Sequence, residues 1–153
     1  MIEYSFLNKY RFKSIPLADS TNFDNFEYKE KLSKDQMKLL KLNEICSPNS
    51  TEFITASVNY KLKLSDKYNT VIITYSPSEV ILITVLANYD SSYNLIDFKQ
   101  IAFDEIFDNW SRTISEIKRD KLYVTNIDYS TAKPIKKYKT YIFDENGKIN
   151  ASH

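Results

Sequence analysis

The chain has 153 residues, of which 42% are hydrophobic and 27% are charged, and these values are typical of one soluble globular domain with a buried core. Its formal net charge of +1 gives no global attraction to nucleic acid or to an anionic membrane. A single Cys, a single His and a single Gly exclude an internal disulfide, a Cys/His zinc site and the glycine-rich loops that hold phosphates. We therefore expect one domain over residues 1–153, with no cofactor and no metal.

The N-terminal sequence MIEYSFLNKYRF has an acidic third residue and lacks the apolar segment of a signal peptide. No apolar run in the chain is long enough for a membrane span. A cytoplasmic location is expected, or a periplasmic or exported one if a leader has been removed from the native chain.

Residues 1–48 are predicted to be helical or irregular and to pack on a β meander formed by residues 53–149. Ser33-Lys-Asp-Gln36 has the pattern of a capping box, in which the Ser side chain accepts from a backbone N–H and the Gln side chain reaches back. Apolar residues follow and a proline ends the pattern, so one helix is predicted over about 34–45.

The segment PLADSTNFDNFEY, residues 16–28, has two interpretations. It could be a ligand loop that uses its Asp side chains, but the spacing lacks the Gly that a calcium loop requires. The pattern Thr21-x-x-Asp24 favours the start of a short helix over about 22–31. Its phenylalanines would then anchor an extended N-terminus onto the sheet.

From Phe53 the hydrophobic period changes to two, which is the pattern of a half-buried strand. The even-numbered residues from Ile54 to Leu64 are mostly apolar and are predicted to share one face. Residues 103–109 are predicted to form a turn or a short helical piece. Further strands are predicted over 70–75, 79–89, 94–102, 110–118, 121–129 and 135–143, and an Asn-Gly turn leads to a short return at 148–149.

The connections between these strands are too short for crossover helices, so neighbouring strands should be antiparallel. The predicted fold class is α+β. It is mainly an antiparallel β meander of about seven strands, as a twisted sheet, a sandwich or an open barrel, with one or two N-terminal helices.

Three acidic residues, Asp104, Glu105 and Asp108, cluster between two predicted strands. Paired carboxylates can perform acid–base chemistry or hold a hard cation. The favoured interpretation is structural, with Asp104 capping a single turn whose apolar neighbours pack inward.

Aromatic and Arg side chains, the residue types enriched in binding hot spots, are spread through the last three predicted strands. They could fill half-buried sheet positions, where Tyr has good strand propensity, or form a binding face. The candidate binding residues are Trp110, Arg112, Tyr123, Tyr129, Tyr138 and Tyr141.

Four lysines interleave with tyrosines near the C-terminus and permit two interpretations. A nucleic-acid strip would combine phosphate contacts with base stacking, whereas an edge strand uses lysines against aggregation. Nearby acidic residues favour the edge strand. The lysines are Lys133, Lys136, Lys137 and Lys139. Cys46, which follows an apolar helix face, is expected to be a buried, inert thiol.

Two stretches carry a resemblance to other proteins: IPLADSTNFDNF (15–26) and NLIDFKQIAFDEIFD (94–108). They resemble small uncharacterised β-rich proteins of Bacteroidota, and the many Lys, Asn, Ile and Tyr residues are typical of such an AT-rich source. The resemblance implies a β-rich shape, and it implies no activity and no site.

These observations favour a non-enzymatic module that binds another protein through its aromatic sheet face. A small bacterial toxin-neutralising (immunity) protein is one instance, because such a protein needs a surface and no catalytic set. The alternatives are a small-molecule or lipid carrier built as a β-barrel around an apolar cavity, and a hydrolase or lyase that uses carboxylates alone. The expected partner is a protein and not nucleic acid, and the sequence leaves the oligomeric state open.

Overall fold

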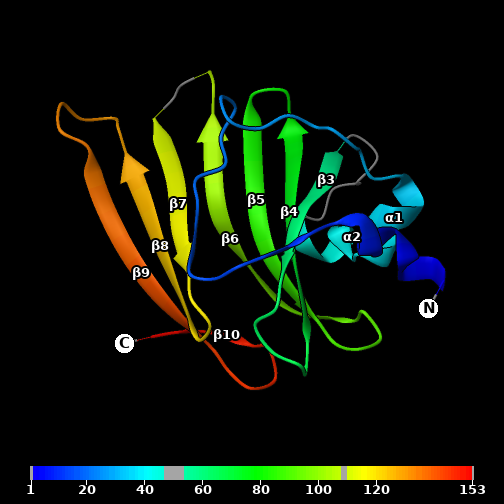
Figure 1. Cartoon of the computed structure of the whole chain (residues 1–153). Coiled ribbons are helices and arrows are strands. Elements are labelled where there is room, and N and C mark those ends of the chain that lie inside the picture. Colours follow the sequence, from blue (N-terminus) through cyan, green and yellow to red (C-terminus); the bar gives the residue numbers. More distant parts are fainter. Residues whose placement is uncertain (1, 47–53, 108–109, 153) are drawn as a thin grey trace.

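The computed structural model describes residues 2–46, 54–107 and 110–152, and one open ten-stranded sheet dominates it (Figure 1). Consecutive strands from β3 to β10 pair antiparallel with their neighbours, so the predicted antiparallel meander with short helices is confirmed. Its strands are β3 (Thr55–Leu62), β4 (Asn69–Ser78), β5 (Ile81–Tyr89), β6 (Leu95–Glu105), β7 (Ser111–Ile117), β8 (Lys121–Asp128), β9 (Ile135–Phe143) and β10 (Ile149–Ala151).

The N-terminal part differs from the predicted extended segment and short helix. It begins with a 3-10 helix, η1 (Ile2–Lys9). Then β1 (Phe12–Lys13) pairs parallel with β3, and β2 (Leu17–Asp19) pairs antiparallel with β7. We call residues 10–31 the strap, because they cross the sheet from β3 to β7 and then return toward β3 (Figure 1).

The helix predicted over 22–31 is absent, and its own polar side chains explain why. The Asn22 Oδ1 atom accepts the backbone N–H groups of Asp24 at 2.8 Å and Asn25 at 3.1 Å. The Asp19 Oδ1 atom accepts the backbone N–H of Thr21 at 3.0 Å. Short polar side chains that bind nearby backbone groups favour turns over helix. The strap therefore forms tight turns over residues 19–25 in place of a helix.

The predicted helix over 34–45 exists as two pieces. α1 (Lys34–Leu39) starts at the expected capping box, and α2 (Leu42–Ile45) follows it. Between them Lys41 adopts a left-handed conformation with φ of 58°. The hydroxyl of Tyr89 on β5 donates to the Leu40 carbonyl at 2.6 Å, so a side chain of the sheet stabilises the break between the two helices.

The capping box gives a direct test of the helical region. Ser33→Ala should lower the free energy of unfolding by about 1 kcal/mol, because the Gln36 N–H loses the acceptor that it has at 3.1 Å. Urea denaturation measures the change. Ser91→Ala, in an exposed turn, is the matched control, and equal stability of the two variants would contradict this role for Ser33.

A β-bulge at Asn59 moves the apolar side chains of strand β3 from one face of the sheet to the other. Val58 lies opposite Ile73, whereas Tyr60 lies opposite the adjacent residue Ile72. The prediction that the even-numbered residues share one face is therefore wrong, because one inserted residue reverses the alternation.

Two hydrophobic cores result, one on each face of the sheet. The first lies under η1, α1 and α2 and includes Leu40, Leu42, Ala56, Val58, Ile73 and Tyr89. The second lies under the strap and includes Tyr60, Leu62, Ile72, Ile101, Ile117, Leu122 and Val124. Cys46 is buried in the first core, and burial raises the pKa of its thiol to about 11, which agrees with the expected inert role.

Strand β6 extends further than predicted. Glu105 lies opposite Ile81 and Asp104 lies opposite Leu82, so the β5–β6 ladder continues into the segment predicted as a turn or helical piece. Asp104 does not cap a helical turn. Its Oδ2 atom accepts the backbone N–H of Phe23 at 3.0 Å and thereby fastens the strap.

Candidate functional site

The register of β7, β8 and β9 places most of the predicted binding residues on one face. Ile117, Leu122 and Val124 point into the second core, and residues one position away along these strands point to the opposite side. We call that opposite side the outer face. It carries Trp110, Arg112, Tyr123, Tyr129 and Tyr138, as the cross-strand partners of these strands and the Tyr129 N–H to Trp110 O bond of 2.7 Å indicate.

Three aromatic side chains of the outer face are exposed. Trp110 is 60% exposed, Tyr138 is 72% exposed and Tyr129 is 40% exposed. Tyr123 is half-buried and borders a shallow groove of about 410 Å³ between β2, β7 and β8. Monomeric proteins rarely gather large apolar side chains in the open without use, so this face is a candidate interface.

Two predicted binding residues have other surroundings. Tyr141 lies opposite Leu122, packs against the second core and has the Lys99 ammonium 4.7 Å from its ring centroid. Arg112 is half-buried, and its Nη2 atom donates to the Ser20 carbonyl at 3.3 Å. The structure therefore separates Tyr141 from the outer face and connects Arg112 to the strap.

Strand β9 lies at the border of the sheet and has a free edge (Figure 1). β10 pairs only with residues 141–143, and the Ser152 N–H donates to the Thr140 carbonyl at 2.8 Å. Among the described residues, none forms a ladder with the free edge of residues 135–139. Lys136, Lys137 and Lys139 lie on this free segment and are exposed.

The carboxylates predicted as a possible catalytic set do not converge in the described part of the chain. Asp104 and Glu105 are adjacent on β6, so their side chains point to opposite faces. Both oxygens of Asp104 accept backbone N–H groups, those of Phe23 and Glu105. Asp108 lies outside the described residues. Within the described ranges, no group of three or more His, Cys, Asp or Glu residues is arranged to hold a metal ion.

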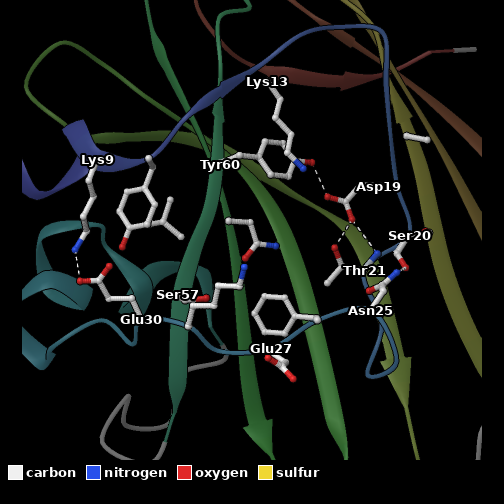
Figure 2. A pocket seen from close by; sticks show the side chains of 16 residues that line it. Lys9, Lys13, Asp19, Ser20, Thr21, Asn25, Glu27, Glu30, Ser57 and Tyr60 are labelled. Atoms are coloured by element: carbon white, nitrogen blue, oxygen red, sulfur yellow. Dashed lines mark hydrogen bonds and ion pairs between the residues drawn. The ribbon is translucent and has the colours of Figure 1, made fainter.

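A polar pocket of about 730 Å³ lies between the strap and β3 (Figure 2). Its walls come from both elements and mix aromatic, charged and amide side chains. The lining residues include Lys13, Asp19, Glu27, Val58, Asn59 and Tyr60.

A buried carboxylate holds the strap at one end of this pocket. The Tyr60 hydroxyl donates to the Asp19 Oδ2 atom at 2.5 Å, and the Thr21 hydroxyl donates to the Oδ1 atom at 2.6 Å (Figure 2). Burial, together with the nearby Asp19 carboxylate, raises the pKa of Tyr60 well above its ordinary value. The Lys13 ammonium lies 4.3 Å from the Tyr60 ring centroid, a cation–π arrangement.

Sequence reasoning missed most of this pocket. It named Asp19 as part of a possible ligand loop, but it did not pair that residue with Tyr60, which lies 41 positions away. Asn59 carries no local signal, since a polar residue is expected between apolar ones in a strand. Only the crossing of the strap over β3 brings these groups together.

Comparisons with protein-family models, with curated proteins and with solved structures find no match. None of the helices in the described ranges has the length and apolar character that a membrane span requires. The two surfaces above are therefore the basis for any functional proposal.

Proposed function

We propose that this chain is a protein-binding module that uses the outer face of β7–β9 and the free edge of β9. The observation that carries the proposal is the exposure of Trp110, Tyr129 and Tyr138 on the same face. Trp and Tyr supply large contact areas at small entropic cost, and they are enriched in interface hot spots. The adjacent groove beside Tyr123 offers a recess for an apolar side chain of the partner.

The charge of the free edge specifies the partner further. Lys136, Lys137 and Lys139 all lie on β9. Because neighbouring residues of a strand point to opposite faces, both faces of this edge are basic. A second copy that paired there would bring lysines against lysines, which edge strands use to prevent self-association. An acidic, extended segment of another protein would gain both backbone hydrogen bonds and charge complementarity. The toxin-neutralising role stays a prediction from the sequence.

A quantitative affinity capture from the native host tests this proposal. The chain should enrich a protein that contains an acidic extended segment, and Trp110→Ala combined with Tyr138→Ala should weaken its binding by at least about 30-fold, the effect of losing a hot spot of about 2 kcal/mol. Purified partner and titration calorimetry then give the affinity directly.

Phe12→Ala is the matched control, because Phe12 is also 60% exposed but lies on β1, away from the outer face. Full retention of the partner by the Trp110/Tyr138 double variant would refute the outer face as the binding surface. Loss of binding in Phe12→Ala alone would place the interface at the other end of the sheet.

A further inference from the structure

The pocket between the strap and β3 exposes a second, interrupted sheet edge. On one side of the gap, the Leu32 N–H donates to the Ala56 carbonyl at 2.8 Å. On the other side, the Lys61 N–H donates to the Arg11 carbonyl at 2.8 Å. Residues 57–60 between these two contacts all line the pocket. The strap at Arg11 and the residue that follows its other end, Leu32, thus pair with β3 on the two sides of this segment and leave it open in the middle.

The strand pattern shows which backbone groups face the opening. Along a strand, the N–H and C=O groups of alternate residues point to the same edge. Since the Ala56 carbonyl points to the outer edge, the N–H and C=O of Val58 point there too, into the pocket that Val58 lines. Within the described part of the chain, neither group has a partner on that edge. Val58 therefore presents one donor and one acceptor, as an incomplete sheet does.

Asn59 adds an acceptor beside them. Its Nδ2 atom donates to the Thr74 hydroxyl at 2.7 Å, which fixes the orientation of the amide. Its Oδ1 atom is buried and lacks a hydrogen-bond partner among the described residues. A buried acceptor without a partner costs about 1–3 kcal/mol, so a ligand N–H that reaches this atom after a shift of the Asn59 side chain would remove a cost that the empty pocket bears.

The charges of the pocket suit a molecule with no net charge. Its lining includes three lysines (Lys9, Lys13 and Lys29) and three acids (Asp19, Glu27 and Glu30). Lys9 pairs with Glu30, and Asp19 is occupied by Tyr60 and Thr21 (Figure 2). Lys13, Lys29 and Glu27 remain for a ligand, and Figure 2 shows Lys13 and Glu27 at opposite ends of the pocket. One positive and one negative site at separate ends match a zwitterion.

We propose that this pocket binds a short extended peptide of two or three residues, which adds to the edge of β3 as a strand. Its backbone N–H and C=O groups pair with Val58, and a further N–H donates to the Asn59 Oδ1 atom. The volume of about 730 Å³ accommodates such a ligand. Lys13 receives the carboxylate of a free peptide, and Glu27 receives its ammonium. The site is separate from the outer face of β7–β9.

Chemical-shift mapping with defined peptides tests this inference. A set of twenty tripeptides of the form Ala-Xaa-Ala is titrated into the ¹⁵N-labelled chain, first with free termini and then as acetylated amides. The backbone amide signals of residues 57–60 should shift with at least one tripeptide, at millimolar concentration or below. A preference for free termini identifies free peptides as the source, whereas a preference for blocked termini identifies an internal segment of a longer chain.

Variants of the pocket complete the test. Asn59→Ala should weaken the best tripeptide about tenfold, the effect expected of one hydrogen bond, whereas Asn94→Ala in the exposed β5–β6 turn should change nothing. Lys13→Ala, at an exposed position, should weaken only the free peptide. The inference is overturned if neither peptide set shifts the signals of residues 57–60, or if Asn59→Ala, still folded, binds as tightly as the natural chain.

Discussion

Asp19→Ala is expected to lower the free energy of unfolding by about 2–4 kcal/mol, because it leaves hydroxyl donors under the strap without their acceptor. The Tyr60 hydroxyl and the Thr21 hydroxyl donate to the two oxygens of this carboxylate at 2.5 and 2.6 Å. Asp19 is itself buried. Its loss also releases the strap from Tyr60, so the wall of the polar pocket should loosen.

Denaturant unfolding and amide hydrogen exchange measure these two effects. Asp24→Ala is the matched control, since Asp24 lies on the same strap but is exposed, and it should change stability by less than about 0.5 kcal/mol. Exchange should accelerate in residues 12–22 of Asp19→Ala and stay slow in β4 and β5. If Asp19→Ala were as stable as Asp24→Ala, the carboxylate would not hold the strap.

The protein is also expected to lose stability steeply as the pH rises above about 10. Burial raises the pKa values of Tyr60, Tyr75 and Tyr89 above the ordinary Tyr value of 10.0. In the unfolded chain each hydroxyl releases its proton near that value, while the folded chain keeps it. The unfolded state therefore binds fewer protons, and each group lowers the free energy of unfolding by about 1.4 kcal/mol per pH unit. The contribution is complete below pH 10 and is lost at higher pH.

Urea unfolding between pH 8 and pH 12 measures this slope. The three tyrosines together predict about 4 kcal/mol per unit once the pH exceeds the ordinary Tyr value. Tyr60→Phe should reduce the slope by about 1.4 kcal/mol per unit. A flat profile up to pH 12 would mean that these hydroxyls are not held protonated by the fold.

The meander could be predicted because its signals are local. Alternating apolar residues and short turns identify each strand, and short turns force antiparallel pairing. The strands predicted over 121–129 and 135–143 agree closely with β8 and β9. The capping box also places the start of α1 correctly, because its partners are three residues apart.

The failures come from interactions between residues far apart in the chain, or from a single inserted residue. The bulge at Asn59 follows from the register with β4, which alternation alone cannot show. The strap is held by contacts of Asp19 with Tyr60 and of Phe23 with Asp104, whose partners lie 41 and 81 positions apart. The turns of the strap themselves have a local cause, because the Asp19 and Asn22 side chains accept backbone N–H groups two or three residues away, where local propensity had favoured a helix.

The two candidate sites differ in how far the sequence could predict them. The outer face could be inferred in outline, since residue types and strand alternation are visible in the sequence, although Tyr141 falls on the other side. The pocket could not, because its walls come from the strap and from β3, and only their crossing creates it. Residue types mark a surface, whereas a pocket requires the fold.

Site-specific photo-crosslinking in the native host tests the central claim, protein binding through the outer face, most directly. A photoreactive Phe analogue replaces Tyr138 in one variant and Phe12 in another, both at exposed positions. We predict that position 138 captures one protein through an acidic extended segment and that position 12 does not. Absence of a crosslink from position 138, or capture of the same proteins from both positions, would contradict the proposed function.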